Sequence, residues 1–218
     1  MAVLNVKNVQ KDFGNSHILK GVDLSLSEGE RCVIKGSSGC GKSTLLYLIG
    51  GLENITAGEI TVDDLNIGKL NDAGLAKYRN SKIGFVFQFH FLLSSLTCLE
   101  NILLPARLGG HSVSKTKKYI ESLAKALGVQ ECLKRYPFEI SGGQQQRINL
   151  IRALSLKPKM LLCDEPTGNL DSKNSKIVAD LIFNLSKELG TTLLVVTHDE
   201  EMAAKFERTH TMVDGILH

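Results

Sequence analysis

Residues 36–43 read GSSGCGKS, which fits the pattern G-x-x-x-x-G-K-[S/T]. An apolar run, RCVIK at 31–35, precedes this stretch, and a helical pattern, KSTLLYLIGGL at 42–52, follows from it. A strand, a glycine-rich loop and a helix in this order form a phosphate-binding loop. An ordinary glycine turn is the alternative, and the flanking strand and helix argue against it. The sequence therefore predicts that the chain binds a nucleoside triphosphate.

The residue types of this loop suit a bound triphosphate. Glycines let backbone N–H groups and the start of the helix approach phosphate oxygens closely. Lys42 adds a positive charge at the β- and γ-phosphates, so it is a predicted catalytic residue, and Ser43 offers its hydroxyl to Mg²⁺. We expect nucleotide contacts along the whole loop, from Gly36, Ser37, Ser38, Gly39, Cys40, Gly41, Lys42, Ser43 and Thr44.

The composition describes one globular domain. The chain has 218 residues, of which 43% are hydrophobic and 22% charged, and only four are proline. A net charge of +3 is too small to indicate a nucleic-acid partner, and the run SKTKK at 114–118 is interpreted as the solvated start of a helix. No segment approaches the ~20 consecutive apolar residues of a membrane helix, and the N-terminus lacks the apolar block of a signal peptide. We therefore expect a cytosolic chain that reaches a membrane only through a partner.

Five cysteines, Cys32, Cys40, Cys98, Cys132 and Cys163, form no C-x-x-C pair. This spacing and the odd number favour reduced, buried thiols over a disulfide framework or a zinc site.

Strand patterns flank a helical middle. Residues 22–26 alternate apolar and polar side chains, and short apolar runs follow at 58–63, 83–87, 160–164 and 192–197. Between about 99 and 156 no strand pattern occurs, while 114–127 have helical spacing and end at Gly128. This order predicts an α/β fold with a mainly parallel sheet covered on both faces. We expect a single domain over 1–218, with a catalytic core at about 1–90 and 157–218 and an inserted helical lobe at about 91–156.

Polar side chains follow three of the apolar strands. Asp164 and Glu165 end the run MLLCDE, where a parallel sheet presents its ligand chemistry. We expect Asp164 to hold Mg²⁺ through water and Glu165 to orient and deprotonate the attacking water. His198 and Gln88 follow two other strands; a lone histidine there is more often structural. Together, these strand ends predict that His198 contacts the γ-phosphate and that Gln88 binds Mg²⁺ or water as a catalytic residue.

A second anion site is predicted at ISGGQQQR, residues 140–147. Ser141 and Gln144 form a capping-box pattern, and Gly142 and Gly143 keep the N–H groups of the helix start accessible. A monomer that already has one phosphate loop has no use for another. We therefore expect this turn to cover ATP bound to a second copy in a head-to-tail homodimer, the alternative being a plain helix cap.

Five motifs in this order, GSSGCGKST, FVFQ, SGGQQQR, DEPTGNLD and VVTHD, resemble the nucleotide-binding domain of ATP-binding cassette (ABC) proteins over nearly the whole chain. The resemblance implies a P-loop NTPase fold with an N-terminal antiparallel β subdomain, and ATP with Mg²⁺ as its ligands. It also implies that Phe13 stacks on adenine and that Asp171 lies near the nucleotide, in the loop that links the two halves of a dimer. Cys40 and Cys163 depart from the residues common in relatives and could make the site sensitive to oxidation.

The stretch FVFQFHFLLSSLTCLENILLP, together with DEPTGNLD, is similar to the ATPase subunits of the lipoprotein-release and macrolide-export group, and less closely to antimicrobial-peptide exporters and a cell-division ATPase. This narrower resemblance implies a peripheral protein on the cytoplasmic face of the inner membrane that works with a membrane permease subunit. Phe85 and Phe87 are expected to be strand core. We expect the apolar loop Phe89–Leu93 to receive the membrane partner, with plain packing of the lobe as the alternative.

Three classes of function are known for chains with motifs like these. An ATPase that drives transport, for lipoprotein release or for macrolide or peptide efflux, is the leading interpretation; an ATPase that signals across the membrane without transport shares every motif. A cassette acting on DNA, ribosomes or iron–sulfur assembly is disfavoured, because the single domain carries no basic arm and no coiled coil. The guanine-reading motif N-K-x-D does not occur, which argues against a GTPase. No residue identifies the transported substrate.

Overall fold

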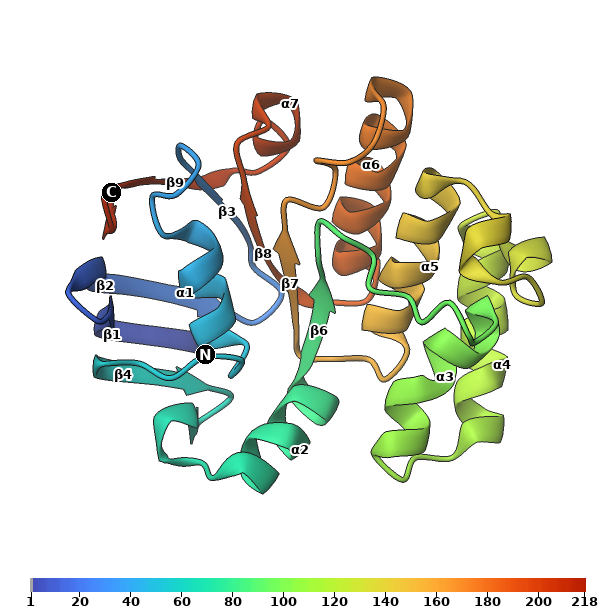
Figure 1. The fold of residues 1–218 in the computed structure, drawn as a ribbon, viewed down its shortest axis with the longest axis horizontal. Helices are drawn as coiled ribbons and strands as arrows, with labels where there is room; N and C mark the ends of the chain where they lie inside the picture. Colours follow the sequence, from blue (N-terminus) through green and yellow to red (C-terminus); the bar gives the residue numbers. More distant parts are fainter. Residues whose placement is uncertain (1) are drawn as a thin grey trace.

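A six-stranded sheet forms the centre of the computed structural model, which describes residues 2–218 (Figure 1). Its strand order is β10-β9-β3-β8-β7-β6. The β9–β10 pair is antiparallel, and the other four pairs are parallel, which confirms the predicted sheet type. The strands are β3 (Arg31–Lys35), β6 (Ile83–Val86), β7 (Met160–Asp164), β8 (Thr192–Thr197), β9 (Arg208–Val213) and β10 (Ile216–Leu217).

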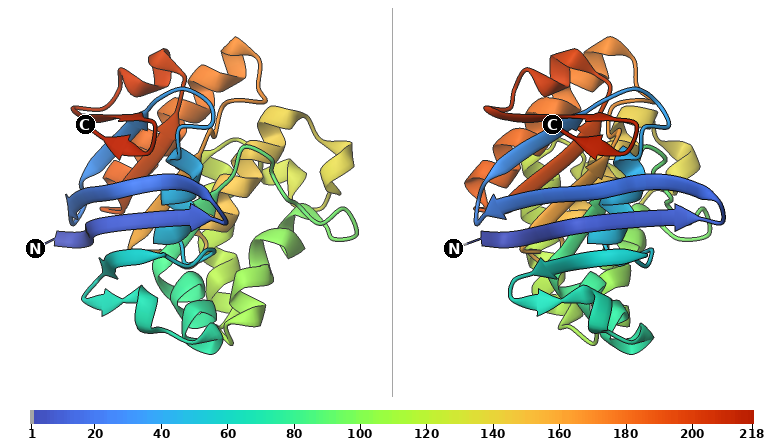
Figure 2. Two further views of the ribbon diagram at one scale, coloured as in Figure 1. Left: turned by 60° about the vertical axis from the view of Figure 1, so that its left-hand side comes forward. Right: turned by 90° about the vertical axis from the view of Figure 1, so that its left-hand side faces the viewer.

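A second, antiparallel sheet is built mainly from the N-terminal residues, as the resemblance implied. Its order is β2-β1-β4-β5, and it lies on one side of the central sheet (Figures 1 and 2). On β2, Val22, Leu24 and Leu26 are buried, while Asp23 and Ser25 between them are exposed, as the alternation predicts. The strands are β1 (Ala2–Phe13), β2 (Ser16–Ser27), β4 (Ala57–Val62) and β5 (Leu65–Asn66).

Helices cover both faces of the central sheet. Alternate residues of β7 show this. Met160 and Leu162 pack in a core shared with α1 and the antiparallel sheet, whereas Leu161 and Cys163 pack in a core shared with α3, α4, α5 and α6. Burial on both faces explains why β7 and β8 are continuous apolar runs. The α-helices are α1 (Lys42–Ile49), α2 (Asp72–Lys82), α3 (Cys98–Leu108), α4 (Val113–Ala126), α5 (Gly142–Leu154), α6 (Ser172–Glu188) and α7 (Glu200–Ala203). The 3₁₀ helices are η1 (Ile67–Lys69), η2 (Gln130–Cys132) and η3 (Pro137–Glu139).

The stretch between β6 and β7 contains helices and no strand, in agreement with the predicted helical insertion. Helices α3 and α4 lie at the far side of the molecule from the antiparallel sheet (Figure 1). Helix α4 is followed by Gly128 in the left-handed region (φ +63°), at the predicted stop. Helix α5 packs both on α3 and on β6. The lobe limits of 91 and 156 stay a prediction, because α5 belongs structurally to both parts.

One expectation about the strand at 83–87 is wrong. Strand β6 ends at Val86, so Phe87 is not strand core; it is half-buried and lines the cavity described below. Phe85 lies within the strand but is also only half-buried. Beyond Val86 the chain leaves the sheet, and Gln88 then lines the cavity at the edge of the sheet where β3, β7 and β8 end.

All five cysteines are buried and free, as predicted. None of the helices between residues 2 and 218 combines the length and the apolar character that a bilayer span requires.

Candidate nucleotide site

A cavity of about 800 Å³ opens where β3, β6, β7 and β8 reach their carboxyl ends. Parallel strands end at one edge of the sheet, so motifs far apart in the sequence meet there. The predicted residues that line the cavity are Phe13, Ser37, Ser38, Gly39, Gly41, Lys42, Ser43, Thr44, Gln88, Asp164, Glu165 and His198. Gly36 and Cys40 belong to the same loop without lining the cavity, and the 141–144 turn and Asp171 lie outside it.

The glycines of the loop are required by its geometry. Gly39 and Gly41 have φ of +80° and +109°, a region that other residues rarely adopt. A Cβ atom on Gly36 would lie 2.4 Å from the carbonyl oxygen of Met212 on β9, so the loop passes too close to its neighbour for a side chain. Helix α1 begins immediately after Gly41, which directs its free N–H groups into the cavity.

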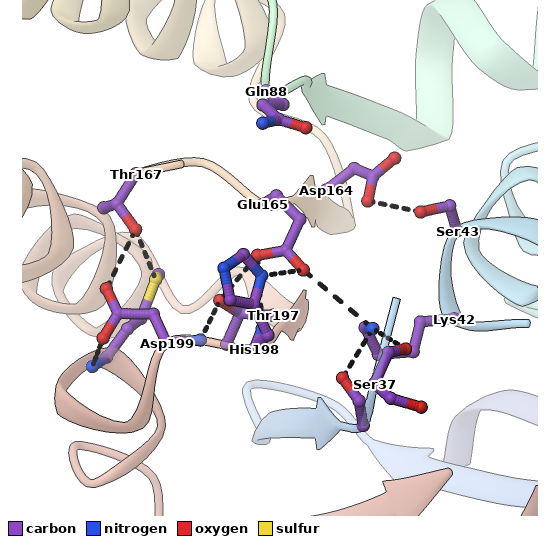
Figure 3. Close-up of polar contacts among 12 residues, drawn as sticks. Ser37, Lys42, Ser43, Gln88, Asp164, Glu165, Thr167, Thr197, His198 and Asp199 are labelled. Atoms are coloured by element: carbon purple, nitrogen blue, oxygen red, sulfur yellow. Dashed lines mark hydrogen bonds and ion pairs between the residues drawn. The ribbon is translucent and has the colours of Figure 1, made fainter. Parts of the chain in front are cut away.

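Lys42 is held inside its own loop. Its Nζ atom donates to the carbonyl oxygens of Gly36 (2.8 Å) and Ser37 (2.9 Å) and lies 4.0 Å from Glu165 Oε1 (Figure 3). The residue is only 6% exposed. A buried ammonium group with carbonyl partners and one nearby carboxylate provides a fixed positive charge at the centre of the cavity.

Asp164 accepts two hydrogen bonds from α1. Ser43 Oγ donates to Oδ1 (2.8 Å) and the Tyr47 hydroxyl donates to Oδ2 (2.7 Å). Burial, followed by the bond to Asp164, raises the pKa of Tyr47 to about 12, so the phenol remains a hydrogen-bond donor even in alkaline solution. Tyr47 was not among the residues predicted from the sequence. Its spacing was the available signal, because a residue four positions after Ser43 lies on the same helix face.

Glu165 is fixed by the end of β8. Thr197 Oγ1 and the His198 backbone N–H donate to Oε2 (2.9 and 3.2 Å), and His198 Nδ1 lies 2.9 Å from Oε1 (Figure 3). Glu165 itself has φ +44°, uncommon for a residue with a side chain. Thr197 was also missed: it is fully buried, and its sequence context is indistinguishable from that of any strand threonine.

Gln88 faces the carboxylates from the end of β6 (Figure 3). Its Nε2 donates to Asn169 Oδ1 (3.3 Å), and Asn169 Nδ2 donates back to the carbonyl oxygen of Gln88 (3.1 Å). A Cβ atom on Gly168 would lie 3.0 Å from Gln88 Nε2, so the glycine of the TGN stretch leaves room for the glutamine. The structure thus joins two motifs that are about eighty residues apart.

The ISGGQQQR turn has the predicted capping box and forms a separate surface. Ser141 N donates to Gln144 Oε1 (2.9 Å), and Gln144 N donates to Ser141 Oγ (3.4 Å). Asp171 caps the neighbouring helix α6 through the backbone and side chain of Asn174 (3.0 and 2.6 Å), bonds that lower the pKa of Asp171. A Cβ atom on Gly143 would lie 2.5 Å from Asn174 Oδ1. The two predicted dimer segments are therefore adjacent in the monomer.

Tyr47→Phe should lower the free energy of unfolding by about 1–2 kcal/mol, because the buried Asp164 carboxylate loses one of its two donors. Urea denaturation of the nucleotide-free protein measures this. Tyr136→Phe removes the hydroxyl of a tyrosine that is 40% exposed and should leave the midpoint unchanged. Equal midpoints for both variants would contradict the role assigned to Tyr47.

Comparison with known proteins agrees with this geometry. The family model described as ABC transporter matches residues 19–168. The lipoprotein-releasing system ATP-binding protein LolD of Porphyromonas gingivalis is 41% identical over 215 residues, covering 99% of this chain and 98% of that protein. LolD of Geobacter metallireducens is 42% identical over 218 residues, covering 98% and 97%.

Two solved structures are similar to this chain in both fold and sequence. A bacterial ABC transporter cassette in dimeric form has a TM-score of 0.89 at 39% identity, covering 98% of this chain and 96% of that one. The dimeric post-hydrolysis state of the same cassette, bound to ADP and phosphate, has a TM-score of 0.87 at 38% identity with the same coverage. The chain therefore belongs to the ABC transporter family, as one of its ATP-binding cassettes.

Proposed function

We propose that the chain is the ATPase subunit of a transporter that releases lipoproteins from the inner membrane. The observation that carries this assignment is the identity of about 41% to LolD proteins over nearly the full length of both chains. In this proposal the chain lies at the cytoplasmic face and drives a separate membrane subunit. Residues of the cavity bind and hydrolyse ATP, and the surface around the cavity contacts the second copy of the chain and the membrane subunit.

ATP binds with its phosphates in the 36–44 loop and its adenine on Phe13, which lines the cavity and is 49% exposed. Lys42 exchanges its two backbone carbonyl partners for β- and γ-phosphate oxygens, which are stronger acceptors because they are charged. The N–H groups at the start of α1 complete the phosphate cradle.

The donors beside the loop suit Mg²⁺. Ser43, Gln88 and Asp164 offer one hydroxyl, one amide and one carboxylate oxygen, and Mg²⁺ is commonly held by few protein oxygens together with substrate phosphates. Within residues 2–218 no cluster of three or more His, Cys, Asp or Glu side chains forms an all-protein metal site. When bound, Mg²⁺ would neutralise charge on the β- and γ-phosphates.

Glu165 is the general base. Its carboxylate is held by Thr197 and His198, so it can accept the proton of a water that lies in line with the γ-phosphate. His198, whose side chain is 68% exposed, would donate to the γ-phosphate through Nε2 when that nitrogen carries a proton, and both ring nitrogens donate at once only in the imidazolium form. Gln88 orients the same water or the metal.

A second copy completes the site. The helix start, where Ser141 and Gly142 are exposed, Gln144 is half-buried and Gly143 is buried, would contact the γ-phosphate held by the other protomer, and Asp171 would lie beside it. The dimeric forms of the similar cassettes support this arrangement. Two ATP molecules are then buried between two chains related by a two-fold axis.

The membrane subunit docks on the loop after Gln88. Phe89, Phe91 and Leu93 are 61%, 63% and 48% exposed, so plain core packing does not account for them. Leu108, at the end of α3, is 78% exposed. Because this apolar loop directly follows Gln88, a movement of the docked subunit could change the position of Gln88 at the nucleotide.

Glu165→Gln should reduce ATP turnover by a factor of about 10² or more, because an amide cannot accept the proton of the attacking water. ATP binding persists, so the variant should accumulate as an ATP-dependent dimer. Size-exclusion chromatography with and without ATP measures this. A variant that stays monomeric at saturating ATP would contradict the shared site.

Ser141→Arg should block hydrolysis while monomer affinity for a fluorescent ATP analogue stays within about twofold, because the turn lies outside the cavity. Ser122→Arg on the exposed surface of α4 serves as the control and should keep full activity. Wild-type turnover by the Ser141 variant would show that the turn has no part in catalysis.

Leu93→Glu should abolish capture of the membrane subunit from native membranes by the tagged chain, because a charge replaces an exposed apolar contact; Leu93, unlike Phe89 and Phe91, does not line the nucleotide cavity. ATP hydrolysis by the isolated variant should fall by less than about threefold. With the captured wild-type complex, release of lipoproteins from reconstituted vesicles supports the assigned substrate. Transport of a macrolide or peptide instead, or ATPase activity with no transport, would replace it with the efflux or signalling alternative.

A further inference from the structure

One face of α5 carries three polar side chains at a spacing of three residues: Gln146, Asn149 and Arg152. Gln146 is 1% exposed and Asn149 is fully buried. Such a face normally packs with apolar residues, and polar groups there require complete hydrogen bonding. None of the three lines the nucleotide cavity, so the reaction described above does not account for them.

The three side chains form a continuous chain of hydrogen bonds in one direction. Arg152 Nη2 donates to Asn149 Oδ1 (2.9 Å), and Asn149 Nδ2 donates to Gln146 Oε1 (3.0 Å). Gln146 Nε2 donates in turn to the carbonyl oxygens of Pro166 (2.6 Å) and Phe87 (3.3 Å). Each amide therefore has its donor and its acceptor assigned by its neighbours.

Arg152 anchors the other end on the loop that follows Gln88. Its Nη2 donates to the carbonyl oxygen of His90 (2.7 Å) and its Nη1 to that of Phe91 (2.8 Å). No carboxylate among residues 2–218 forms an ion pair with it. Burial lowers its pKa only to about 10, so the guanidinium remains charged and its donors are used on the backbone of this loop.

Both ends of the chain hold strained backbone. Phe91 has φ +46° and Glu165 has φ +44°, values that L residues with side chains rarely adopt and that surrounding contacts must maintain. Arg152 binds the carbonyl of Phe91 itself, and Gln146 binds the carbonyl of Pro166, the residue after Glu165. The hydrogen-bond chain thus connects the two strained positions across one helix face.

We propose that Gln146, Asn149 and Arg152 act as one positioning unit that sets the loop around Gln88 and the turn of Glu165 relative to each other. The inference rests on the proposed roles of Gln88 and Glu165. The three residues act through Phe87, His90, Phe91 and Pro166, whose carbonyl oxygens flank the two catalytic side chains, and they do not touch the nucleotide. Because α5 also begins at the Ser141 turn, the same helix fixes three parts of the composite site.

Asn149→Asp tests the unit at its centre with almost no change in shape. The carboxylate still accepts from Arg152 but cannot donate to Gln146. We expect kcat for ATP hydrolysis to fall about tenfold to hundredfold, because a displacement of about 1 Å in a catalytic group has that effect. The KM for ATP should stay within about twofold, because the phosphate loop is unchanged. Wild-type kcat in this variant would overturn the proposal.

A matched control variant distinguishes a loss of kcat through misplaced catalytic groups from a loss caused by removing any buried polar group. Ser186 is 1% exposed and donates only within α6, to the carbonyl oxygen of Phe183 (2.9 Å). Ser186→Ala should leave kcat and KM unchanged. If it lowers kcat as much as Asn149→Asp at the same loss of unfolding midpoint, the effect is one of stability and the proposal fails.

A double-mutant cycle tests whether the residues act together. Gln146 and Arg152 make no direct hydrogen bond and meet only through Asn149 and the backbone of residues 87–91. Independent roles would give multiplying losses of kcat in Gln146→Met, Arg152→Met and the double variant. If the residues act as a single unit, the kcat of the double variant should be no lower than that of the slower single variant. Multiplying losses would overturn the proposal. Absence of turnover in the wild-type chain would instead refute the proposed ATPase function.

Discussion

The parallel register of β3, β8 and β7 is the constraint on which the rest of the molecule depends. It aligns Lys35 with Thr197 and Val196 with Asp164, so the phosphate loop and both carboxylates leave the sheet at one edge. Lys42 then lies 4.0 Å from Glu165, a contact between residues that are more than a hundred positions apart. A shift of one residue in the β7–β8 pairing would turn the side chain of Asp164 to the opposite face of the sheet, away from the phosphate loop.

Helix α5 connects that edge to the molecule's surfaces. Its first turn presents Ser141, one face packs on the core, and the polar side chains of that face bind the loop after Gln88 and the turn after Glu165. The site therefore has two layers. Strand ends place the groups that we propose touch ATP, and α5 relates those groups to the surface proposed for the second protomer and to the exposed phenylalanines. In the proposed function, catalysis, dimerisation and docking would therefore all depend on this one helix.

Most of the fold and much of the site were predictable from local patterns. The phosphate loop, the apolar strands and the capping box of Ser141 each depend on neighbouring residues, and each is present. Thr197, Tyr47 and the face with Asn149 were missed, because their roles depend on which elements pack together. Phe87 was placed wrongly, since an alternation of aromatic residues does not show where a strand ends. Polar residues at helical spacing normally indicate a solvated face, so the buried chain along α5 had no sequence signal.

The proposed function requires that each ATP site be built from two copies of the chain. Mixing two inactive variants tests it most directly: Lys42→Ala, which lacks the phosphate contact, and Ser141→Arg, which lacks the opposing turn. A mixed dimer retains one intact site, in which Lys42 from one chain faces Ser141 from the other. An equal mixture should regain ATPase activity, up to about one quarter of the wild-type rate for random pairing. A mixture no more active than the two variants measured separately would contradict it.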